Sequence, residues 1–398
     1  MTNHVNMDTP VIISACRTPI GKFGKSLVGV SAPSLGALVI EEALKRARIS
    51  ADDVDEVMMG NVVSAGLGQN PTRQAAIHAG VPYGAGSITV NKVCGSGLKA
   101  VMLAASTIKA GDNRVVVAGG MESMSNTPYL ARGMRWGTKF GDARLQDSMI
   151  ADGLWDAYHN YHMGLTGERI AQRFHITRRE ADEFAYDSHM KASRASKAGF
   201  FDAEKVKVKI EHEGGEVTEF LDDECIRADT TIEKLGKLKP AFKPEGVLTA
   251  GNSSQLSDGA SAVVVTSERV ADKLGVKPIA RIVAYGTGGL EPARVMEAPI
   301  PTTKALLKKA KMEVDDLDLF EHNEAYSTAS IAVRRSLGVD ESRFNASGGA
   351  VALGHPIGCS GARVLTTLIY GLKRTGKKTG FATLCLGGGN AVAMIVEA

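Results

Sequence analysis

The sequence lacks three features, and each absence argues against a class of protein. No uninterrupted apolar segment approaches the ~18 residues that a membrane-spanning helix needs. The formal net charge is only +3, so the overall charge gives no indication of binding to nucleic acid or to a membrane surface. The cysteines number five, an odd count in a long chain, which argues for free thiols in a reducing compartment.

The ends of the sequence also lack targeting signals. Met1–Thr9 contains no lysine, no arginine and no apolar core, so the usual signal and transit patterns are not expected. The last residues, Ile395–Ala398, do not form a peroxisomal signal. We therefore expect a cytoplasmic protein. With 398 residues, 44% of them hydrophobic, and 44 glycines, it should hold two or three globular domains with many tight turns.

The strongest chemical signal is the stretch Asn91–Ala100, NKVCGSGLKA. Ser87–Val90 before it is rich in β-formers and bounded by glycines, which predicts a buried strand, and the apolar residues after it recur at helical spacing. Cys94 should therefore lie on a strand-to-helix turn, where amide hydrogens and the helix dipole would stabilise a thiolate. Gly95 and Gly97 would let another molecule approach closely. An isolated cysteine is more often a buried core residue. This setting instead favours a nucleophile.

Strands and helices alternate in the first and last thirds of the chain, which predicts βαβ units and a mostly parallel sheet. Both thirds contain an Asp-Asp-x-Asp motif before an apolar strand, a Ser-Gly pair that opens a helix, and a strand that ends in glycines. Two halves built on one plan explain this shared order better than chance similarity does. The expected strands are 10–15, 57–59, 115–120, 279–285 and 381–386, and the expected helices are 35–46, 98–108, 303–310 and 364–372.

The middle of the chain lacks this alternation. Residues 1–120, completed by 250–275, should form the amino-terminal half and 276–398 the carboxyl-terminal half, while 121–249 should be an insertion that covers the site. In the insertion, Thr177–Glu180 is a capping box that opens a helix, and 205–210 alternates like a strand with one solvated face. A basic stretch is either a solvated face or a landing site for a phosphorylated ligand. It consists of Arg227, Lys234, Lys237, Lys239 and Lys243.

Three later motifs complement Cys94. Glu321–Tyr326 directly follows an apolar strand, and open parallel sheets place ligands at such strand ends. His355 lies in a glycine-rich loop beside a proline, which makes it a candidate base for the thiol. Cys385 ends a strand before Gly387–Gly389, whose amides suit an oxyanion hole, although a buried strand residue is the alternative for this cysteine.

Together these motifs resemble the thiolase family, and within it the short-chain acetyl-CoA acetyltransferases. The resemblance runs from about Pro10 to Ala398 and rests on VCGSG at Cys94, GGAVALGHPIGCSGAR at His355 and CLGGG at Cys385. It implies an α/β fold with a duplicated core in five αβαβα layers and an inserted loop domain. It also implies coenzyme A thioesters as substrates, no tightly bound cofactor and no metal.

The resemblance supplies catalytic roles. Cys94 would accept an acetyl group from acetyl-CoA, with His355 activating its thiol. Cys385 would remove the α-proton of a second acetyl-CoA to give acetoacetyl-CoA and free CoA, or protonate the leaving carbanion in reverse. Each step develops a negative charge that needs preorganised donors. One oxyanion hole would comprise His355 and a water held by Asn323, and the other the backbone amides of Cys94 and Gly387.

Further positions match substrate contacts of the family. Arg227 and Ser254 match residues that touch the adenine and pantetheine parts of CoA. His162 and Met163 match the stretch beside the acyl group in biosynthetic members, which suggests acetyl and acetoacetyl groups rather than long chains. Tyr326, expected in the pocket, stands where the family usually has phenylalanine. A second departure is Cys359, where alanine is common.

Alternatives remain beside this interpretation. The nearest is a broader 3-ketoacyl-CoA thiolase of β-oxidation. Condensing enzymes of fatty-acid synthesis share the fold but typically have histidine in place of the second cysteine, so Cys385 argues against them. A non-catalytic acyl-CoA or lipid-binding protein is disfavoured by the joint presence of Cys94, Asn323, His355 and Cys385. The resemblance also implies a homotetramer built as a dimer of dimers.

Overall fold

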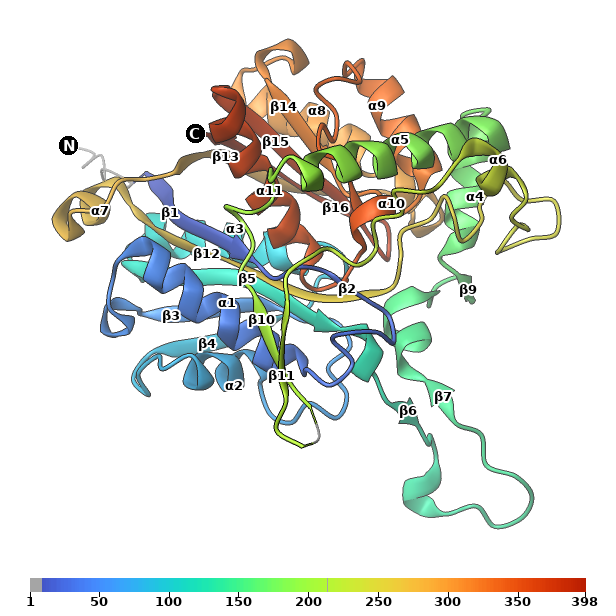
Figure 1. Cartoon of the computed structure of the whole chain (residues 1–398), viewed down its shortest axis with the longest axis horizontal. Helices are drawn as coiled ribbons and strands as arrows, with labels where there is room; N and C mark the ends of the chain where they lie inside the picture. Colours follow the sequence, from blue (N-terminus) through green and yellow to red (C-terminus); the bar gives the residue numbers. More distant parts are fainter. Residues whose placement is uncertain (1–8, 213) are drawn as a thin grey trace.

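The computed structural model describes residues 9–212 and 214–398 (Figure 1). Two α/β lobes, formed mainly by the first and last thirds of the chain, lie against each other, and the middle of the sequence runs over them. Within the described ranges no helix is long and apolar enough to cross a membrane. At the amino terminus, Met1–Thr9 was expected to contain no targeting signal. Apart from Thr9, this segment lies outside the described residues.

A single sheet runs through both lobes. Its main path is β14-β15-β16-β13-β1-β12-β5-β3-β4, and the short β2 pairs with β12. The lobes join where β1 meets β13 through two residue pairs, Val11 with Arg281 and Ile12 with Ala280. The strands are β1 (Pro10–Arg17), β2 (Gly21–Lys22), β3 (Glu56–Gly60), β4 (Gly86–Val90), β5 (Val115–Ser123), β12 (Ser257–Ser267), β13 (Ala280–Gly289), β14 (Leu319–His322), β15 (Thr379–Leu386) and β16 (Asn390–Glu397).

The prediction of a mostly parallel sheet is wrong. Parallel pairing in this sheet is limited to β3 with β4, β3 with β5, and β14 with β15. The pairs between these groups are antiparallel. The reason is β12 and β16, two apolar strands that were not predicted. β16 follows β15 after a three-glycine turn, and so short a connection joins only antiparallel strands.

Three expected elements differ in detail. β4 is an edge strand rather than a buried one, because it pairs only with β3 and leaves Ile88 42% exposed. β5 continues through the glycines that were expected to turn, and a Cβ on Gly120 would lie 2.0 Å from the carbonyl oxygen of Gly358. The half-solvated strand begins at Val208 instead of Lys205 and keeps the predicted alternation of buried and exposed residues.

Helices cover both faces of each lobe and produce five layers, as the resemblance implied. α1 and α2 pack on the outer face of the amino-terminal lobe, α8 packs on the outer face of the other lobe, and α3 and α11 lie together between the lobes. Buried residues of α3 and α11 join strands of both lobes into one apolar core. The helices are α1 (Ala32–Ala47), α2 (Pro71–His78), α3 (Ser96–Ala110), α7 (Glu268–Leu274), α8 (Pro299–Ala310), α9 (Ser327–Leu337), α10 (Ala350–Leu353) and α11 (Ser360–Thr375).

The predicted repeat is confirmed in the matching elements of the two lobes. The acidic motifs form equivalent 3₁₀ turns, Ala51–Asp53 and Val314–Asp316, that lead into β3 and β14. The Ser-Gly pairs open α3 and α11, the two helices that meet at the centre. The repeat therefore places the starts of these two helices beside each other in space.

The middle segment contains shorter elements. Thr177 caps α5 as predicted, because its backbone amide donates to Glu180 Oε2 at 2.7 Å while its hydroxyl accepts from the Glu180 amide. α5 packs against α9 and α10 of the carboxyl-terminal lobe. The elements are β6 (Tyr129–Leu130), β7 (Gln146–Asp147), β8 (Trp155–Asp156), β9 (Tyr161–His162), α4 (Gly164–Arg173), α5 (Arg178–Lys197), β10 (Val208–Glu211), β11 (Val217–Phe220) and α6 (Ile232–Gly236).

Candidate active site

Cys94 lies on the turn between β4 and α3, as predicted. Side chains of the turn hold it in place: Asn91 Oδ1 accepts from the Val93 amide at 3.1 Å. Ser96 Oγ accepts from the Lys92 amide at 2.8 Å and donates to the Val93 carbonyl at 2.6 Å. Val93 has φ +48°, a left-handed conformation that a β-branched residue adopts only under constraint. The tight turn therefore fixes the position of Cys94.

The glycines beside Cys94 serve the fold rather than an incoming molecule, which corrects the expectation. A Cβ on Gly95 would lie 2.1 Å from Leu386 Cδ2 of β15. A Cβ on Gly97 would lie 2.8 Å from the backbone nitrogen of Ala362 in α11. The missing side chains let the carboxyl-terminal lobe pack directly on the Cys94 turn. That contact brings the glycine-rich end of β15 to the nucleophile.

The expected stabilised thiolate is also wrong for the unliganded site. Burial raises the pKa of the Cys94 thiol to about 11. The backbone amides of Gly387 and of Cys94 itself act in the opposite direction, but burial outweighs them. Cys94 is therefore a neutral thiol at rest, and its reaction requires a base.

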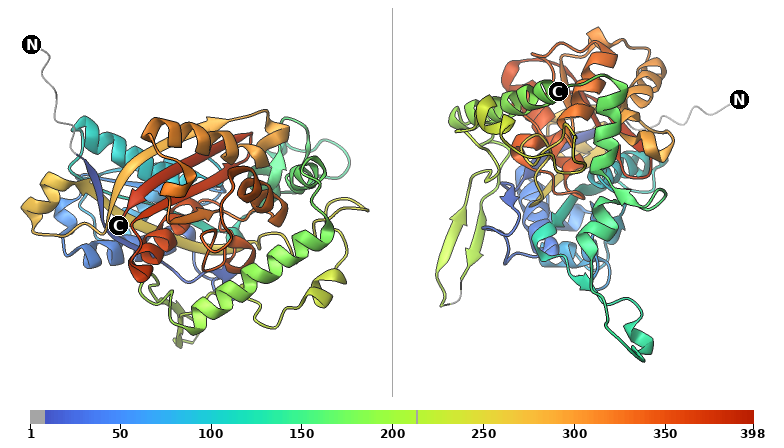
Figure 2. Two further views of the ribbon diagram at one scale, coloured as in Figure 1. Left: turned by 90° about the horizontal axis from the view of Figure 1, so that it is seen from above. Right: turned by 90° about the vertical axis from the view of Figure 1, so that its right-hand side faces the viewer.

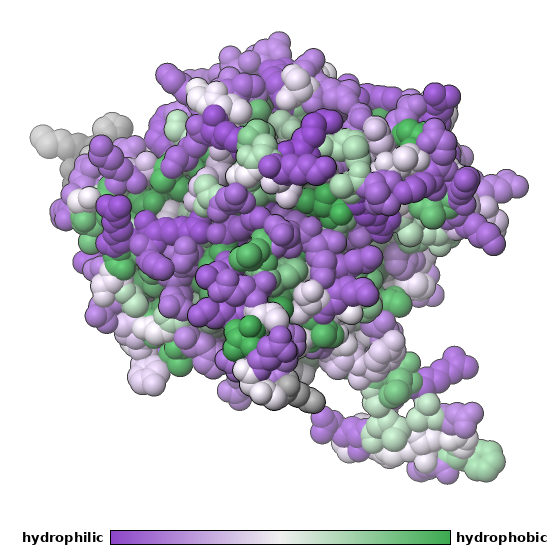
Figure 3. Space-filling model, viewed as in Figure 1, coloured by the Kyte–Doolittle hydropathy of each residue, from purple (hydrophilic) through white to green (hydrophobic). Residues whose placement is uncertain are grey.

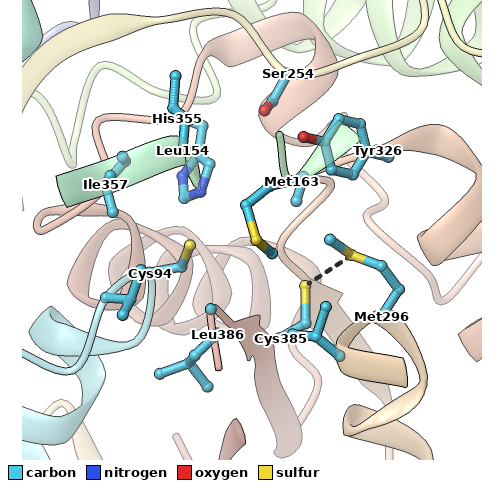
Figure 4. Close-up of a pocket in the computed structure, with 15 residues that line it drawn as sticks. Cys94, Leu154, Met163, Ser254, Met296, Tyr326, His355, Ile357, Cys385 and Leu386 are labelled. Carbon is cyan, nitrogen blue, oxygen red and sulfur yellow. Dashed lines mark hydrogen bonds between the residues drawn. The ribbon is translucent and has the colours of Figure 1, made fainter. Parts of the chain in front are cut away.

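His355 provides a neutral base beside Cys94 (Figure 4). Its Nδ1 lies 2.5 Å from Ser360 Oγ, and that hydroxyl donates to the Pro356 carbonyl at 2.8 Å. Because the hydroxyl proton is used there, Nδ1 carries the imidazole hydrogen and Nε2 keeps a lone pair. Burial, assisted by Arg363, lowers the pKa of His355 to about 3, so the ring is uncharged. A neutral ring with a lone pair on Nε2 can accept a thiol proton.

Asn323 directly follows β14, and its side chain contacts the imidazole of His355. Its Nδ2 is 3.4 Å from His355 Nε2. Its Oδ1 is buried and has no hydrogen-bond partner among residues 9–212 and 214–398. A buried carbonyl oxygen with no protein partner is a favourable place for an ordered water. Asn323 can thus hold a water next to His355, although it does not itself line the pocket.

Cys385 reaches the same pocket from the end of β15 in the other lobe. Its thiol points to Met296, with 3.7 Å between the two sulfur atoms (Figure 4). Burial, reinforced by negative charge on Cys94, raises the pKa of Cys385 well above its ordinary value. Gly387 lines the pocket as well, and its backbone amide lowers the pKa of the Cys94 thiol. Two thiols, a neutral imidazole and a backbone amide therefore face one space.

The reaction pocket, lined by Cys94 and Cys385, is small and mostly apolar. The space between Leu154, Met163, Met296 and other apolar side chains measures about 460 Å³, part of which is open to solvent. A larger groove of about 1060 Å³ adjoins it. The two spaces share lining residues: Leu154, Ser254, Tyr326, His355 and Ile357.

The predicted substrate residues divide between the two spaces. Ser254 and Tyr326 line both, whereas Met163 lines only the reaction pocket. Arg227 and His162 line only the groove. The resemblance placed His162 beside the acyl group, and in the structure its ring stacks on Phe242 with 5.0 Å between centroids.

The basic stretch contributes one residue to the groove, Arg227, whose guanidinium donates to Gln255 Oε1 at 3.1 Å. Its lysines do not line the groove. Lys234 Nζ lies 2.8 Å from Asp229 Oδ2 on the surface, and Lys243 Nζ lies 3.8 Å from Glu168 Oε2. The structure favours a solvated face for the lysines.

Three residues of the site were not predicted. Met296 and Phe242 come from segments without a recognisable pattern, and only the folded chain brings them to the pocket and groove. Ser360 was assigned only to the start of a helix. A hydroxyl five residues beyond His355 was a local signal for a partner of the imidazole.

Known proteins are similar to the chain over nearly its whole length. The family model "Thiolase, N-terminal domain" matches residues 10–269, and "Thiolase, C-terminal domain" matches residues 276–398. The chain is 51% identical over 391 residues to the acetyl-CoA acetyltransferase of Cupriavidus necator, covering 98% of this chain and 100% of that one. It is 50% identical over 388 residues to the acetyl-CoA acetyltransferase of Pseudomonas aeruginosa, covering 98% and 99%.

A solved structure of another protein also has a very similar fold. The crystal structure of the Bacillus anthracis acetyl-CoA acetyltransferase superimposes with a TM-score of 0.97 at 41% identity, covering 98% of this chain and 99% of that one. Both domain models together span nearly the whole sequence, and the relatives match over almost their full length. The chain belongs to the thiolase family.

Proposed function

We propose that this chain is an acetyl-CoA C-acetyltransferase, which condenses two molecules of acetyl-CoA to acetoacetyl-CoA and free CoA and catalyses the reverse cleavage. One observation carries the proposal: Cys94 and Cys385, from different lobes, line one pocket together with His355. An acyl-transfer enzyme needs one thiol, whereas a carbon–carbon condensation needs a second group to move a carbon-bound proton. Relatives about half identical to the chain carry the name of this activity.

In the first step, the Cys94 sulfur attacks the carbonyl carbon of acetyl-CoA. Its proton passes to His355 Nε2 and then to the departing CoA thiolate, leaving an acetyl-cysteine. The negative charge on the carbonyl oxygen develops beside the amides of Cys94 and Gly387, which already converge on the Cys94 sulfur in the unliganded site.

In the second step, the Cys385 thiol first gives its proton to neutral His355 Nε2, and the resulting thiolate takes a proton from the methyl carbon of the next acetyl-CoA. The enolate attacks the acetyl carbon, the bond to Cys94 breaks, and the departing Cys94 thiolate takes the proton from His355 Nε2 as acetoacetyl-CoA is released. His355 Nε2, protonated in this step, and a water held by Asn323 would stabilise the enolate oxygen. In the cleavage direction the Cys385 thiol supplies its proton to the leaving carbanion. Because burial keeps Cys385 protonated, the resting site is ready for cleavage.

Coenzyme A would lie in the groove, with Arg227 near the adenine end and Ser254 near the pantetheine arm. Met163 and Met296 line the small reaction pocket together with the two thiols, which favours acetyl and acetoacetyl groups over long chains. His162 would act on the groove side through its stacking on Phe242. The proposal requires no tightly bound cofactor and no metal ion. In this scheme residues 121–249 form the inserted domain that covers the CoA site, 1–120 with 250–275 the first core half, and 276–398 the second.

The proposed enzyme is a homotetramer, a dimer of dimers. An arm over residues 127–147 projects from the body and carries exposed apolar residues (Figures 1 and 3). They are Tyr129, Met134, Trp136, Phe140 and Leu145, of which Phe140 is 100% exposed. The edge strand β4 offers a second, separate surface with unpaired backbone groups. Two distinct surfaces are what a dimer of dimers requires. The thiol state of the described cysteines fits a reducing cytoplasm.

Thiolysis of 3-ketoacyl-CoA substrates of increasing chain length tests the proposal. Acetoacetyl-CoA should be cleaved with a far higher kcat/KM than 3-ketooctanoyl-CoA, because the pocket lined by the two methionines is small. Equal values for both would indicate the broader β-oxidation thiolase instead. Acetyl-CoA should also label the wild-type protein covalently, and Cys94→Ala should lose both labelling and turnover while keeping its fold. A variant still labelled to the wild-type extent would refute the assignment of Cys94.

A further inference from the structure

The hydroxyl of Tyr326 is a hydrogen-bond donor without a protein partner at the entrance of the reaction pocket. The residue is only 7% exposed and lines both the pocket and the groove. Its hydroxyl forms no hydrogen bond with any of residues 9–212 and 214–398. Figure 4 shows this hydroxyl and that of Ser254 on the same side of the pocket, both directed inward. The hydroxyl oxygen is accessible from the pocket space, so a ligand that brings an acceptor can pair with it there.

The surrounding structure holds the phenol ring in this position. The ring of Phe242 meets it edge-on, with 5.8 Å between centroids and an angle of 86°. A Cβ on Gly167 would lie 3.0 Å from Tyr326 Cδ2, so α4 presses directly on the ring. The backbone of Tyr326 pairs with Ser253, and the Ser254 amide donates to Ala325. The hydroxyl is therefore preorganised, and ligand binding loses little conformational entropy in orienting it.

The phenol stays neutral under working conditions. Burial, together with negative charge on Cys94 or Cys385, raises the pKa of Tyr326 well above its ordinary value. It therefore keeps its hydrogen, which it can donate to an acceptor of the ligand, and it does not serve as an acid or a base. Because the pocket wall around it is apolar, that single polar contact should be selective.

The position of the hydroxyl identifies the acceptor. Tyr326 lines both the groove and the pocket, so the arm attached to the thioester sulfur passes its hydroxyl whenever the acyl group reaches Cys94. The thioester carbonyl already has the amides and His355 as donors in the proposed function. The next acceptor along the arm is the carbonyl oxygen of the cysteamine amide, two methylenes and one nitrogen beyond the sulfur.

We propose that Tyr326 is a positioning and specificity-determining residue whose hydroxyl donates a hydrogen bond to the cysteamine amide carbonyl of the CoA thioester. The inference rests on the proposed function. It predicts that the enzyme distinguishes thioesters by the arm that carries the acyl group, in addition to the acyl group itself. Tyr326→Phe removes the donor and keeps the ring.

The test compares wild type and Tyr326→Phe on three substrates: acetoacetyl-CoA, the acetoacetyl thioester of N-acetylcysteamine, and acetoacetyl S-pentyl thioester, which lacks the amide. With saturating CoA as the acceptor, kcat/KM for each substrate reports only the half-reaction in which it acylates Cys94. The variant should lose roughly tenfold on the two amide-containing substrates, the usual effect of one hydrogen bond to a ligand, and should be unchanged on the S-pentyl thioester. A lesion that only disturbed the fold would reduce all three alike.

Tyr370→Phe is the matched control. Its hydroxyl donates to the Ala15 carbonyl at 2.9 Å, away from the pocket, so it should show no dependence on the arm of the substrate. Equal losses of Tyr326→Phe on all three substrates, or no loss on acetoacetyl-CoA, would overturn the proposal. Calorimetric binding of CoA alone gives a second test, with roughly tenfold weaker binding expected for Tyr326→Phe. If the wild type failed to cleave acetoacetyl-CoA, the proposed function would be wrong. The binding measurement would still show whether Tyr326 forms the hydrogen bond with the CoA arm.

Discussion

Alkylation of Cys94 in the unliganded enzyme tests how its thiol is activated. Burial places the pKa of this thiol at about 11 and that of His355 at about 3. Both shifts oppose moving the proton from sulfur to imidazole before substrate binds, so the neutral pair is favoured at rest. At pH 8, about one Cys94 in a thousand should be a thiolate. The base acts when the substrate is attacked, and it does not maintain a thiolate at rest.

The assay follows the mass of the intact protein during reaction with iodoacetamide, an uncharged reagent that reacts with thiolates. The second-order rate should rise about tenfold per pH unit between about pH 6 and about pH 9, because the thiolate fraction rises in that way below the pKa. His355→Ala should be alkylated at nearly the wild-type rate at each pH. Its turnover should nevertheless fall by ~10²–10⁴, the usual cost of losing a general base. Cys94→Ala measures the background from the buried cysteines.

A different pH profile would refute this reasoning. A stable thiolate–imidazolium pair would give an alkylation rate that stays level through neutral pH and collapses in His355→Ala. Such a result would mean that the amides of Cys94 and Gly387, with the helix dipole, outweigh burial. Cys94 would then be active before substrate arrives.

Three further predictions follow from the same geometry. Cys385→Ala should still accept an acetyl group on Cys94 but lose ~10²–10⁴ in acetoacetyl-CoA formation and in exchange of acetyl hydrogens with deuterated water; parallel losses in acylation would count against a separate role. Ser360→Ala leaves the imidazole Nδ1–H buried without its acceptor, so rapid-quench acylation should slow at least about tenfold while CoA affinity is kept, and an unchanged rate would reject the tautomer assignment. Replacing Trp136 and Phe140 on the arm by serine should convert tetramers to dimers in sedimentation velocity with the pocket intact, whereas an unchanged mass would remove the arm from the interface.

The sequence by itself determined the local structure and the identity of the residues that carry the chemistry. The Cys94 turn, the Thr177 capping box and the matching starts of α3 and α11 followed from short-range patterns, because caps, turns and helical spacing depend on neighbours in the chain. The repeat indicated two similar lobes for the same reason.

Only the tertiary structure decided how these pieces meet and what their surroundings do to them. The antiparallel centre of the sheet depends on β12 and β16, whose apolar runs do not reveal their pairing partners. The raised pKa of Cys94 depends on burial by the other lobe, which cannot be read from the turn itself. His162 and Met163 are adjacent in the chain, yet one lines the groove and the other the reaction pocket. Long-range packing separates such neighbours and joins residues as distant as Cys94 and Cys385, since contact with water and with other side chains is a property of the folded chain as a whole.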